Sequence, residues 1–144
     1  MSPPPTFPAR ILVVEDHPEV SATIRYLLKR AGCETRCAGT AADALRWAAL
    51  ERFDLITLDL DLPDMDGTEL FRQFQRDPRL DGVPMVFVSA RSSEEDRQRC
   101  LDLGGADYIA KPFDAPTFVT RILARLKITG EAGRPDGEVF GSRD

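Results

Sequence analysis

Residues 55–67 read LITLDLDLPDMDG and carry the strongest structural signal in the chain. The first four residues are apolar or β-branched, which is typical of a short strand buried on both faces of a parallel sheet. Asp59 then stands where the strand should end, Asp61 follows, and Pro63 removes a backbone donor. A carboxylate at the end of a buried strand is costly to desolvate unless a cation, a metal or hydrogen bonds compensate it. We therefore expect Asp59 to have partners elsewhere in the chain.

Short apolar runs of the same kind recur on both sides of this stretch. They indicate strands near residues 10–15, 33–38, 55–58, 85–89 and 106–110. Longer amphipathic segments follow each run, and the first of them begins at Pro18. It places Val20, Ile24 and Leu28 at helical spacing. This alternation predicts an α/β domain in which helices link five parallel strands.

Polar side chains follow four of the five predicted strands. The first strand ends in Glu15 and Asp16, the third in Asp59, the fourth in Ser89 and the fifth in Lys111. Parallel strands with right-handed helical crossovers place all their carboxyl ends at one edge of the sheet, where ligands bind. We therefore expect these side chains to meet at that edge.

The chemistry of this set favours phosphoryl transfer with a divalent cation. Three converging carboxylates repel one another, and a hard cation with oxygen ligands holds them together. Mg²⁺ fits best because it accepts one or two carboxylates, a backbone carbonyl and several waters. Lys111 and the Ser89 hydroxyl can each bind a phosphoryl oxygen. The set predicts a carboxylate that accepts a phosphoryl group.

Composition narrows the class of protein. The 144 residues correspond to one domain, and 42% hydrophobic with 30% charged residues is typical of a globular protein. The net charge of −5 argues against nucleic-acid binding by this chain alone. No apolar run approaches the ~20 residues of a membrane span. The three cysteines, Cys33, Cys37 and Cys100, fit no metal spacing and indicate small buried residues in a reducing cytoplasm.

Together these residues resemble the receiver domain of two-component response regulators. The matching residues are Glu15-Asp16, the segment Asp59 to Gly67 with Pro63, Ser89-Ala90, Tyr108 and Lys111-Pro112-Phe113. The resemblance covers roughly residues 9–127 and rests on several motifs in the same order and spacing. It implies an α/β, doubly wound (βα)5 flavodoxin-like fold. The five-stranded parallel sheet would have the order 2-1-3-4-5, with helices on both faces.

The resemblance implies a metal-assisted phosphoacceptor. Asp59 would take a phosphoryl group from phosphohistidine on a sensor histidine kinase or a histidine phosphotransfer protein. Asp16 and Asp59 would bind Mg²⁺ directly, and the backbone carbonyl of Asp61 would be a third ligand. Glu15 would act mainly through a bound water.

The resemblance also implies a switch. Lys111 and Ser89 would hold the phosphoryl oxygens, and Ser89 would move toward the phosphate. Tyr108 would then rotate inward behind Ser89. This movement would change the face made by the fourth helix, the fifth strand and the fifth helix.

The predicted organisation is a receiver domain over residues 9–127. Residues 1–8 are expected to form a disordered tail, and residues 128–144 a flexible tail or linker. The chain is then either a stand-alone receiver that acts on a downstream protein partner or the front part of a regulator with a fused output domain. The resemblance is compatible with a homodimer through the fourth helix, fifth strand and fifth helix, but no residue pattern specifies one.

Two other functions compete with this interpretation. Asp59-Leu60-Asp61 resembles the nucleophile motif of haloacid-dehalogenase-type phosphatases, but their metal-binding acidic pair comes late in the chain, whereas Glu15-Asp16 comes first. A receiver fold used as an interaction module without phosphorylation is the other alternative. That module has no need for the complete set of acidic residues and Lys111. We therefore expect a signalling phosphoacceptor and not an enzyme.

Four other residues are close in sequence to the predicted site residues. Asp61 and Arg91 stand two residues past the acceptor and two past the serine, so they could pair across the site. We hypothesise that this pair shields the acyl phosphate and lengthens its life. His17 is interpreted as a solvated residue at the rim, because magnesium prefers oxygen ligands. Asp64 is interpreted as a turn residue.

Overall fold

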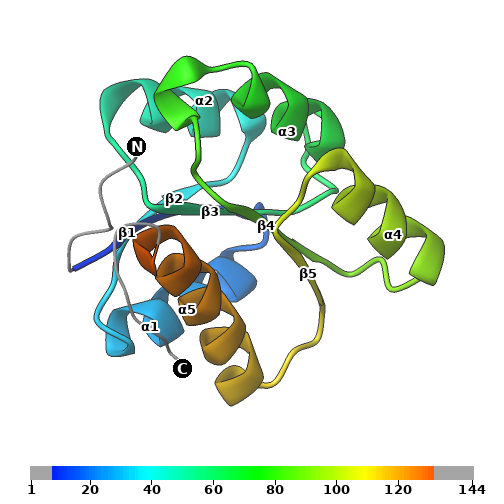
Figure 1. Cartoon of the computed structure of the whole chain (residues 1–144). Coiled ribbons are helices and arrows are strands. Elements are labelled where there is room, and N and C mark those ends of the chain that lie inside the picture. The colour runs from blue at the N-terminus through cyan, green and yellow to red at the C-terminus, as the bar shows by residue number, and fades with distance from the viewer. Residues whose placement is uncertain (1–7, 132–144) are drawn as a thin grey trace.

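The computed structural model describes residues 8–131, in which strands and helices alternate from end to end (Figure 1). The elements are β1 (Arg10–Val14), α1 (Pro18–Arg30), β2 (Glu34–Ala38), α2 (Ala41–Leu50), β3 (Leu55–Leu58), α3 (Gly67–Gln75), the short 3-10 helix η1 (Pro78–Leu80), β4 (Met85–Ser89), α4 (Glu94–Leu103), β5 (Asp107–Ala110) and α5 (Ala115–Glu131). Both predicted end segments fall largely outside the described residues, since only Pro8 of the first and residues 128–131 of the second are covered.

All five strands are parallel and lie in the order β2-β1-β3-β4-β5. The predicted order 2-1-3-4-5 is therefore confirmed. Val14 at the end of β1 pairs with Leu58 at the end of β3, which in turn pairs with Phe87 near the end of β4. The carboxyl ends of the strands consequently share one edge of the sheet, and β1 and β3 lie at its centre.

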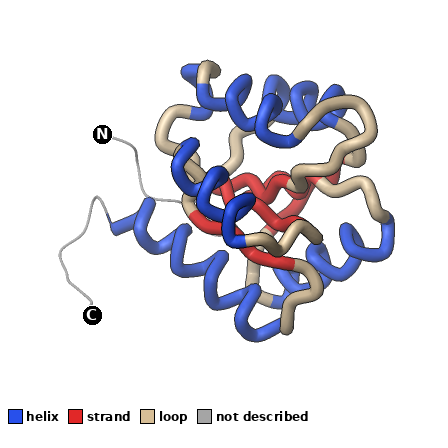
Figure 2. Tube along the Cα trace, turned by 90° about the vertical axis from the view of Figure 1, so that its right-hand side faces the viewer, coloured by secondary structure: helices blue, strands red, loops and turns tan. Residues whose placement is uncertain are grey.

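Helices cover both faces of the sheet. Figures 1 and 2 show α2 and α3 on one side and α1 and α5 on the other. In β1, Leu12 and Val14 belong to the core on the side of α2, α3 and α4, whereas Ile11 and Val13 belong to the core with α1 and α5. Successive side chains of a strand point to opposite faces, so each central strand contributes to both cores.

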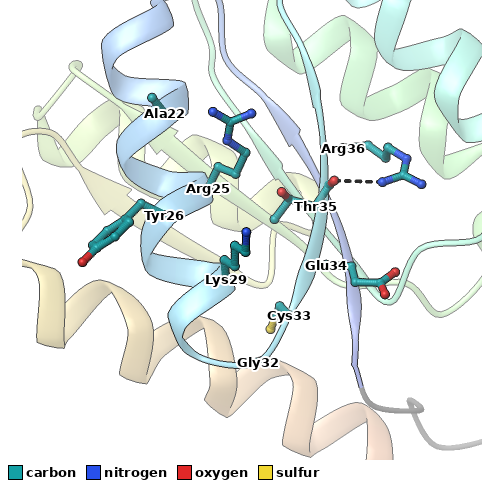
Figure 3. Close-up of a pocket in the computed structure, with 9 residues that line it drawn as sticks. All are labelled: Ala22, Arg25, Tyr26, Lys29, Gly32, Cys33, Glu34, Thr35 and Arg36. Carbon is teal, nitrogen blue, oxygen red and sulfur yellow. Dashed lines mark hydrogen bonds between the residues drawn. The ribbon is translucent and has the colours of Figure 1, made fainter.

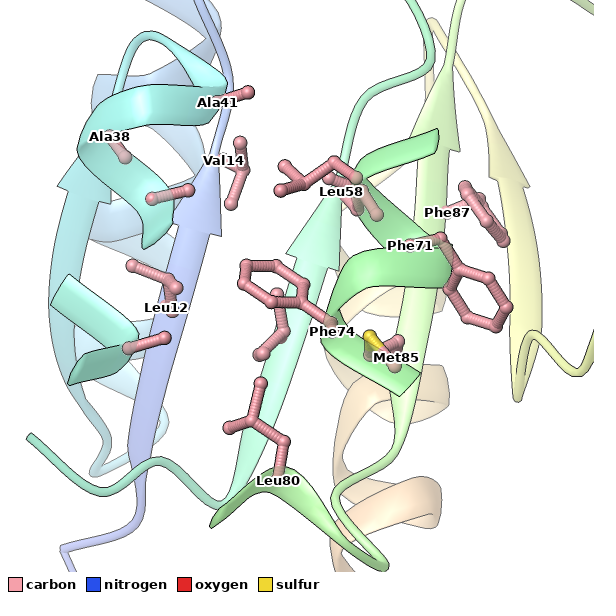
Figure 4. Packing of buried hydrophobic residues seen from close by; sticks show 14 of the residues in the cluster. Leu12, Val14, Ala38, Ala41, Leu58, Phe71, Phe74, Leu80, Met85 and Phe87 are labelled. Atoms are coloured by element: carbon pink, nitrogen blue, oxygen red, sulfur yellow. The ribbon is translucent and has the colours of Figure 1, made fainter. Parts of the chain in front are cut away.

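The larger core is built around phenylalanine side chains of α3 and β4 (Figure 4). Phe71 and Phe74 on α3 are almost fully buried, and the Phe71 ring lies 5.1 Å from that of Phe87 on β4. Leu80 on η1 is also buried and closes one end of this core. This packing fixes α3 against the sheet, and α3 follows the loop that carries the acidic residues 59–66.

Polar caps begin the helices next to the site. The Thr40 side chain accepts a hydrogen bond from the Asp43 N–H at the start of α2, as its spacing predicts. At α4, Ser93 accepts one from Asp96. Asp66 caps α3 through the Thr68 N–H. These caps fix where each loop ends and each helix begins.

The last helix is longer than the sequence predicts. The helical pattern ends near Lys127, but α5 continues to Glu131, four residues further. Once a helix is established, each added residue gains a hydrogen bond without a new nucleation step, so it can extend past its amphipathic segment. Among residues 8–131, no helix combines the length and apolar character that a membrane span requires.

Two leucine truncations test the assignment of the core. Leu12 is fully buried, whereas Leu50 on α2 is 64% exposed. We expect Leu12→Ala to lower the free energy of unfolding by about 2–5 kcal/mol, because it leaves a cavity in the core. Leu50→Ala should change it by less than about 0.5 kcal/mol. Urea denaturation followed by circular dichroism measures both, and equal losses would contradict the assignment.

Candidate functional site

An ion-paired cluster lies where β1, β3 and β5 end. The side chains of Glu15, Asp59 and Lys111 are only 2%, 3% and 12% exposed. Lys111 Nζ donates to Glu15 Oε1 over 2.7 Å and to Asp59 Oδ2 over 3.0 Å. Residues from three strands thus meet at one edge of the sheet, as the order of the strands predicts. One ammonium group holds two buried carboxylates together.

The charged groups in this cluster shift one another's pKa values. Burial raises the pKa of Asp59, and the negative charge of Glu15 adds to this effect, while hydrogen bonds from the Asp61 N–H and from Lys111 oppose it. Burial alone would lower the pKa of Lys111, but its bonds to Glu15 and Asp59 outweigh burial and raise it. The lysine therefore stays protonated and keeps its positive charge in the site.

The acidic residues leave room for a cation. The carboxylates of Glu15, Asp16 and Asp59 and the His17 imidazole can each offer one ligand atom, and these atoms lie within 4.8 Å of one another. Asp16 Oδ1 is buried and has no hydrogen-bond partner among the described residues. A buried, unpartnered carboxylate oxygen is costly unless a cation binds it. The donor set, mostly carboxylate oxygen, suits a hard divalent cation such as Mg²⁺.

His17 lies at the rim of this cluster, and its side chain is 68% exposed. Its Nδ1 is 3.2 Å from Glu15 Oε2 and 3.4 Å from Asp16 Oδ1. The exposure agrees with the interpretation of His17 as a solvated residue. Its contacts with both acidic residues were not predicted, because the spacing of neighbouring residues does not show how their side chains turn.

The opposite wall of the site is formed by the loops after β3 and β4. Arg91 Nη2 lies 2.6 Å from Asp61 Oδ1, so the ion pair predicted from the sequence is confirmed. The Arg91 N–H donates to Ser89 Oγ over 3.1 Å, and Ser89 is fully buried. The Asp61 N–H donates to Asp59 Oδ1 over 3.2 Å. Asp61 and Arg91 therefore connect the acceptor loop to the serine.

Tyr108 lies on the inside of the molecule in this structure. Its side chain is buried, its ring packs 6.5 Å from that of Phe87, and its hydroxyl donates to the backbone carbonyl of Arg91. Burial raises the pKa of this hydroxyl. The ring thus occupies the inward position that the resemblance implies for the switch. Arg91 contacts both proposed switch residues, Ser89 and Tyr108.

Asp64 has a structural role that its interpretation as a turn residue missed. Its two carboxylate oxygens accept hydrogen bonds from the Ala41 N–H at 2.8 Å and the Ala42 N–H at 3.0 Å. These bonds lower the pKa of Asp64. The first N–H groups of a helix have no hydrogen-bond acceptor within the helix. The Asp64 carboxylate supplies the acceptors for two of these groups in α2. The acceptor loop is thereby attached to the neighbouring helix.

Gly67 sets how closely α3 approaches the acceptor strand. A Cβ atom at this position would lie 2.3 Å from the Asp59 carbonyl oxygen and 2.6 Å from the Leu60 Cα. The Gly67 N–H donates to the Leu60 carbonyl at 2.8 Å. Only glycine leaves room for this contact without a backbone shift. The Asp66-Gly67 pair therefore both begins α3 and positions the loop after Asp59.

Comparison with known proteins identifies the family. The family model described as "Response regulator receiver domain" matches residues 11–123, which include the whole acidic cluster and Lys111. The chain belongs to the response-regulator receiver family. This membership favours the receiver interpretation over that of a haloacid-dehalogenase-type phosphatase. Receiver domains are components of two-component signalling systems, so the expected class of function is confirmed at this level.

Relatives of this receiver domain include longer regulators. The chain is 35% identical over 130 residues to sensory transduction protein RegX3 of Mycolicibacterium smegmatis, which is 88% of this chain and 56% of that protein. It therefore spans little more than half the length of such a relative.

Solved structures support the fold and the character of the site. A CheY-like receiver domain protein from Methanospirillum hungatei JF-1 has a TM-score of 0.80 and 30% identity, covering 87% of this chain and 98% of that one. The receiver domain of sensor histidine kinase PA1611 from Pseudomonas aeruginosa PAO1 has a TM-score of 0.75 and 29% identity, covering 83% and 98%. That domain was solved with a magnesium ion coordinated in its active-site cleft.

Two glycine substitutions test the close approach at Gly67. We expect Gly67→Ala to lower the free energy of unfolding by about 1–3 kcal/mol, because the added methyl group collides with backbone. Gly39, in the loop after β2, has nothing within 4 Å of its Cβ position and serves as control. Gly39→Ala should change stability by less than about 1 kcal/mol. Equal effects in chemical denaturation would refute the contact.

Proposed function

We propose that this receiver domain accepts a phosphoryl group on Asp59 from a phosphohistidine and uses it to switch a partner-binding face. The observation that carries the proposal is the buried cluster in which Lys111 joins Glu15 to Asp59 while Asp16 keeps a buried oxygen without a hydrogen-bond partner. A structural cluster would gain more from apolar residues than from three carboxylates and one lysine. The arrangement is useful if a cation and a phosphoryl group complete it.

The proposed transfer is a single displacement at phosphorus. One carboxylate oxygen of Asp59 attacks the phosphorus, the bond from phosphorus to the histidine nitrogen breaks, and the imidazole leaves as a neutral ring because its other nitrogen carries the proton. The ammonium of Lys111, held beside Asp59 at 3.0 Å, can bind a phosphoryl oxygen. The Ser89 hydroxyl can bind another. Asp59 must be ionised to attack, so its raised pKa predicts that phosphorylation slows as the solution becomes acidic.

The proposed metal ligands are the carboxylates of Asp16 and Asp59 and the backbone carbonyl of Asp61, with Glu15 acting through a water. Mg²⁺ bound there would neutralise carboxylate charge and the charge of the phosphoryl oxygens. The buried oxygen of Asp16 that lacks a hydrogen bond and the magnesium ion in the PA1611 receiver domain support this assignment. The proposed donor is a sensor histidine kinase or a histidine phosphotransfer protein.

The proposed switch runs through Ser89, Arg91 and Tyr108. If Ser89 Oγ turns to the phosphoryl group, it gives up its bond with the Arg91 N–H, and the loop that also holds the Tyr108 hydroxyl is free to move. The Tyr108 ring is already buried inside the molecule in this structure. Phosphorylation would therefore change the fraction of molecules in which the ring holds this position. The affected face is formed by α4, β5 and α5, where a downstream partner, a fused output domain or a second copy would bind.

Phosphorylation with a small donor tests the acceptor. We expect acetyl phosphate with Mg²⁺ to add one phosphoryl group to the wild-type chain, detected by intact mass spectrometry. Asp59→Asn should react at least about 100-fold more slowly, because the attacking carboxylate is gone. Asp81→Asn is the control, since Asp81 is an exposed aspartate after η1. A gain that survives Asp59→Asn would refute the acceptor, and no gain in the wild type would favour an interaction module.

The Asp61–Arg91 pair makes a second prediction. We expect Arg91→Ala to speed the loss of the phosphoryl group by about twofold to fivefold, the effect of one exposed ion pair, because water gains access to the acyl phosphate. Arg97→Ala is the matched control, since Arg97 makes an exposed ion pair with Glu94 within α4 and none with Asp61. Dephosphorylation is followed by mass spectrometry after the donor is removed. Unchanged or slower loss in Arg91→Ala would remove the shielding role.

A further inference from the structure

A groove of about 820 Å³ lies between α1 and β2 (Figure 3). It is lined by Ala22, Arg25, Tyr26 and Lys29 of α1 and by the consecutive residues Gly32 to Arg36. The last three of these, Glu34 to Arg36, are consecutive residues of β2. Successive residues of a strand point to opposite faces, so a groove lined by three of them in a row follows the edge of the strand. None of these residues belongs to the acidic cluster around Asp59.

The edge of β2 that faces this groove has backbone groups without a strand partner. β2 is the last strand on its side of the sheet, with β1 as its only neighbour. The Glu34 N–H donates to the Ala9 carbonyl, and the Ala38 carbonyl accepts from the Glu15 N–H, so these residues direct their backbone toward β1. The alternation of a parallel ladder then turns Thr35 and Cys37 outward. The Thr35 carbonyl accepts only a guanidinium group of Arg36, at 3.2 Å.

Two cationic side chains of α1 line the groove without a counter-ion. Arg25 and Lys29 stand four residues apart on one face of α1, and Figure 3 shows both extending into the space beside β2. Among the side chains that the structure describes, those of residues 8–126, neither has an ion-pair or side-chain hydrogen-bond partner. Like charges at this spacing destabilise a helix slightly.

The other charges around the groove are already satisfied. Glu34 is the only acidic residue that lines it, and it lies 3.7 Å from Arg10. The Arg36 side chain pairs with Glu51 on the side of α2. Tyr26, which also lines the groove, is 58% exposed and can cover apolar atoms of a bound chain. The free charge that faces the groove is therefore positive.

We propose that this groove binds an extended acidic segment of a partner protein, which adds to β2 as a sixth strand. Its backbone would pair with the outward N–H and C=O groups of Thr35 and Cys37, and its carboxylates would pair with Arg25 and Lys29. Addition of a strand to a sheet edge supplies affinity through the main chain and specificity through side chains. Backbone groups without a strand partner and cations without an ion pair lie beside the same groove, and such a segment satisfies both.

Two other occupants fit less well. A second copy paired edge to edge through β2 would bring its own Arg25 and Lys29 against those of the first, and like charges repel. A nucleic acid would meet an acidic chain with only two free cations at the groove, far fewer than phosphate binding normally uses. The acidic segment is the occupant that the charges favour.

The test uses the full chain and a fluorescent peptide of about eight residues, the length of an ordinary strand, that alternates threonine with glutamate. We expect saturable binding by fluorescence anisotropy at low salt, with amide shifts in NMR spectra centred on Thr35 and Cys37. The same peptide with lysine in place of glutamate should bind at least about tenfold more weakly. Binding should be the same in Asp59→Asn, which separates this proposal from the phosphoacceptor.

Variants distinguish the contribution of the two cationic side chains to peptide binding from that of backbone pairing. The double variant Arg25→Glu, Lys29→Glu should weaken binding at least about tenfold through charge reversal. The double variant Arg52→Glu, Arg76→Glu makes the same change of net charge at two exposed residues outside the groove and should bind as the wild type does. Thr35→Pro removes one outward N–H from an edge strand, where proline is tolerated, and should also weaken binding. Circular dichroism checks that each variant is folded.

Four results would overturn the proposal. They are no binding of the acidic peptide by the folded wild type, binding that survives the charge reversal, amide shifts centred away from α1 and β2, and concentration-dependent shifts at β2 without peptide. The last result would identify a second copy as the occupant. Tighter binding of a single-stranded oligonucleotide that is unaffected by Thr35→Pro would instead identify a phosphate polyanion.

Discussion

Three carboxylates and one ammonium group share the edge of the sheet, and this imbalance of charge governs the site. Lys111 bonds to both Glu15 and Asp59, which are almost fully buried, while Asp16 keeps a buried oxygen without a hydrogen-bond partner. Negative charge in excess of its counter-ion is unfavourable in a buried site. The cluster therefore destabilises the free domain and makes it receptive to a cation. The rest of the fold is stable enough to offset this cost and keep the charged residues together.

The fold supplies that stability and the geometry of the site together. The central strands β1 and β3 contribute side chains to cores on both faces, so their carboxyl ends are fixed from both sides. The loop after β3 is then held at three points: Gly67 packs against the Asp59 backbone, Asp64 bonds to the start of α2, and Asp61 pairs with Arg91. A loop that carries the proposed acceptor residue needs such attachments, because the bare sheet fixes only where the strand ends.

Patterns within short stretches of sequence predicted most of the fold and the main site residues. The apolar runs predicted the strands, and the shared edge of parallel strands predicted that Glu15, Asp59 and Lys111 meet, as their hydrogen bonds confirm. The sequence did not reveal the bond from Asp64 to α2, since its partners lie 22 and 23 residues away. It also did not reveal that Tyr108 lies inside, because residue spacing does not specify a rotamer. The cationic groove at β2 depends on the unoccupied edge of the sheet and on the absence of partners, neither of which a local pattern shows.

The most direct test of the charge imbalance is the free energy of unfolding of the wild type and Asp59→Asn, with and without Mg²⁺. The pKa of Asp59 is raised in the folded state, so its ionised form destabilises the fold, and this effect disappears as pH falls below the range in which Asp59 ionises. Without metal at neutral pH, Asp59→Asn should be the more stable protein, with a gap that narrows in acid. Mg²⁺ should stabilise the wild type more than the variant. A less stable variant without metal, or equal stabilisation of both by Mg²⁺, would contradict the account.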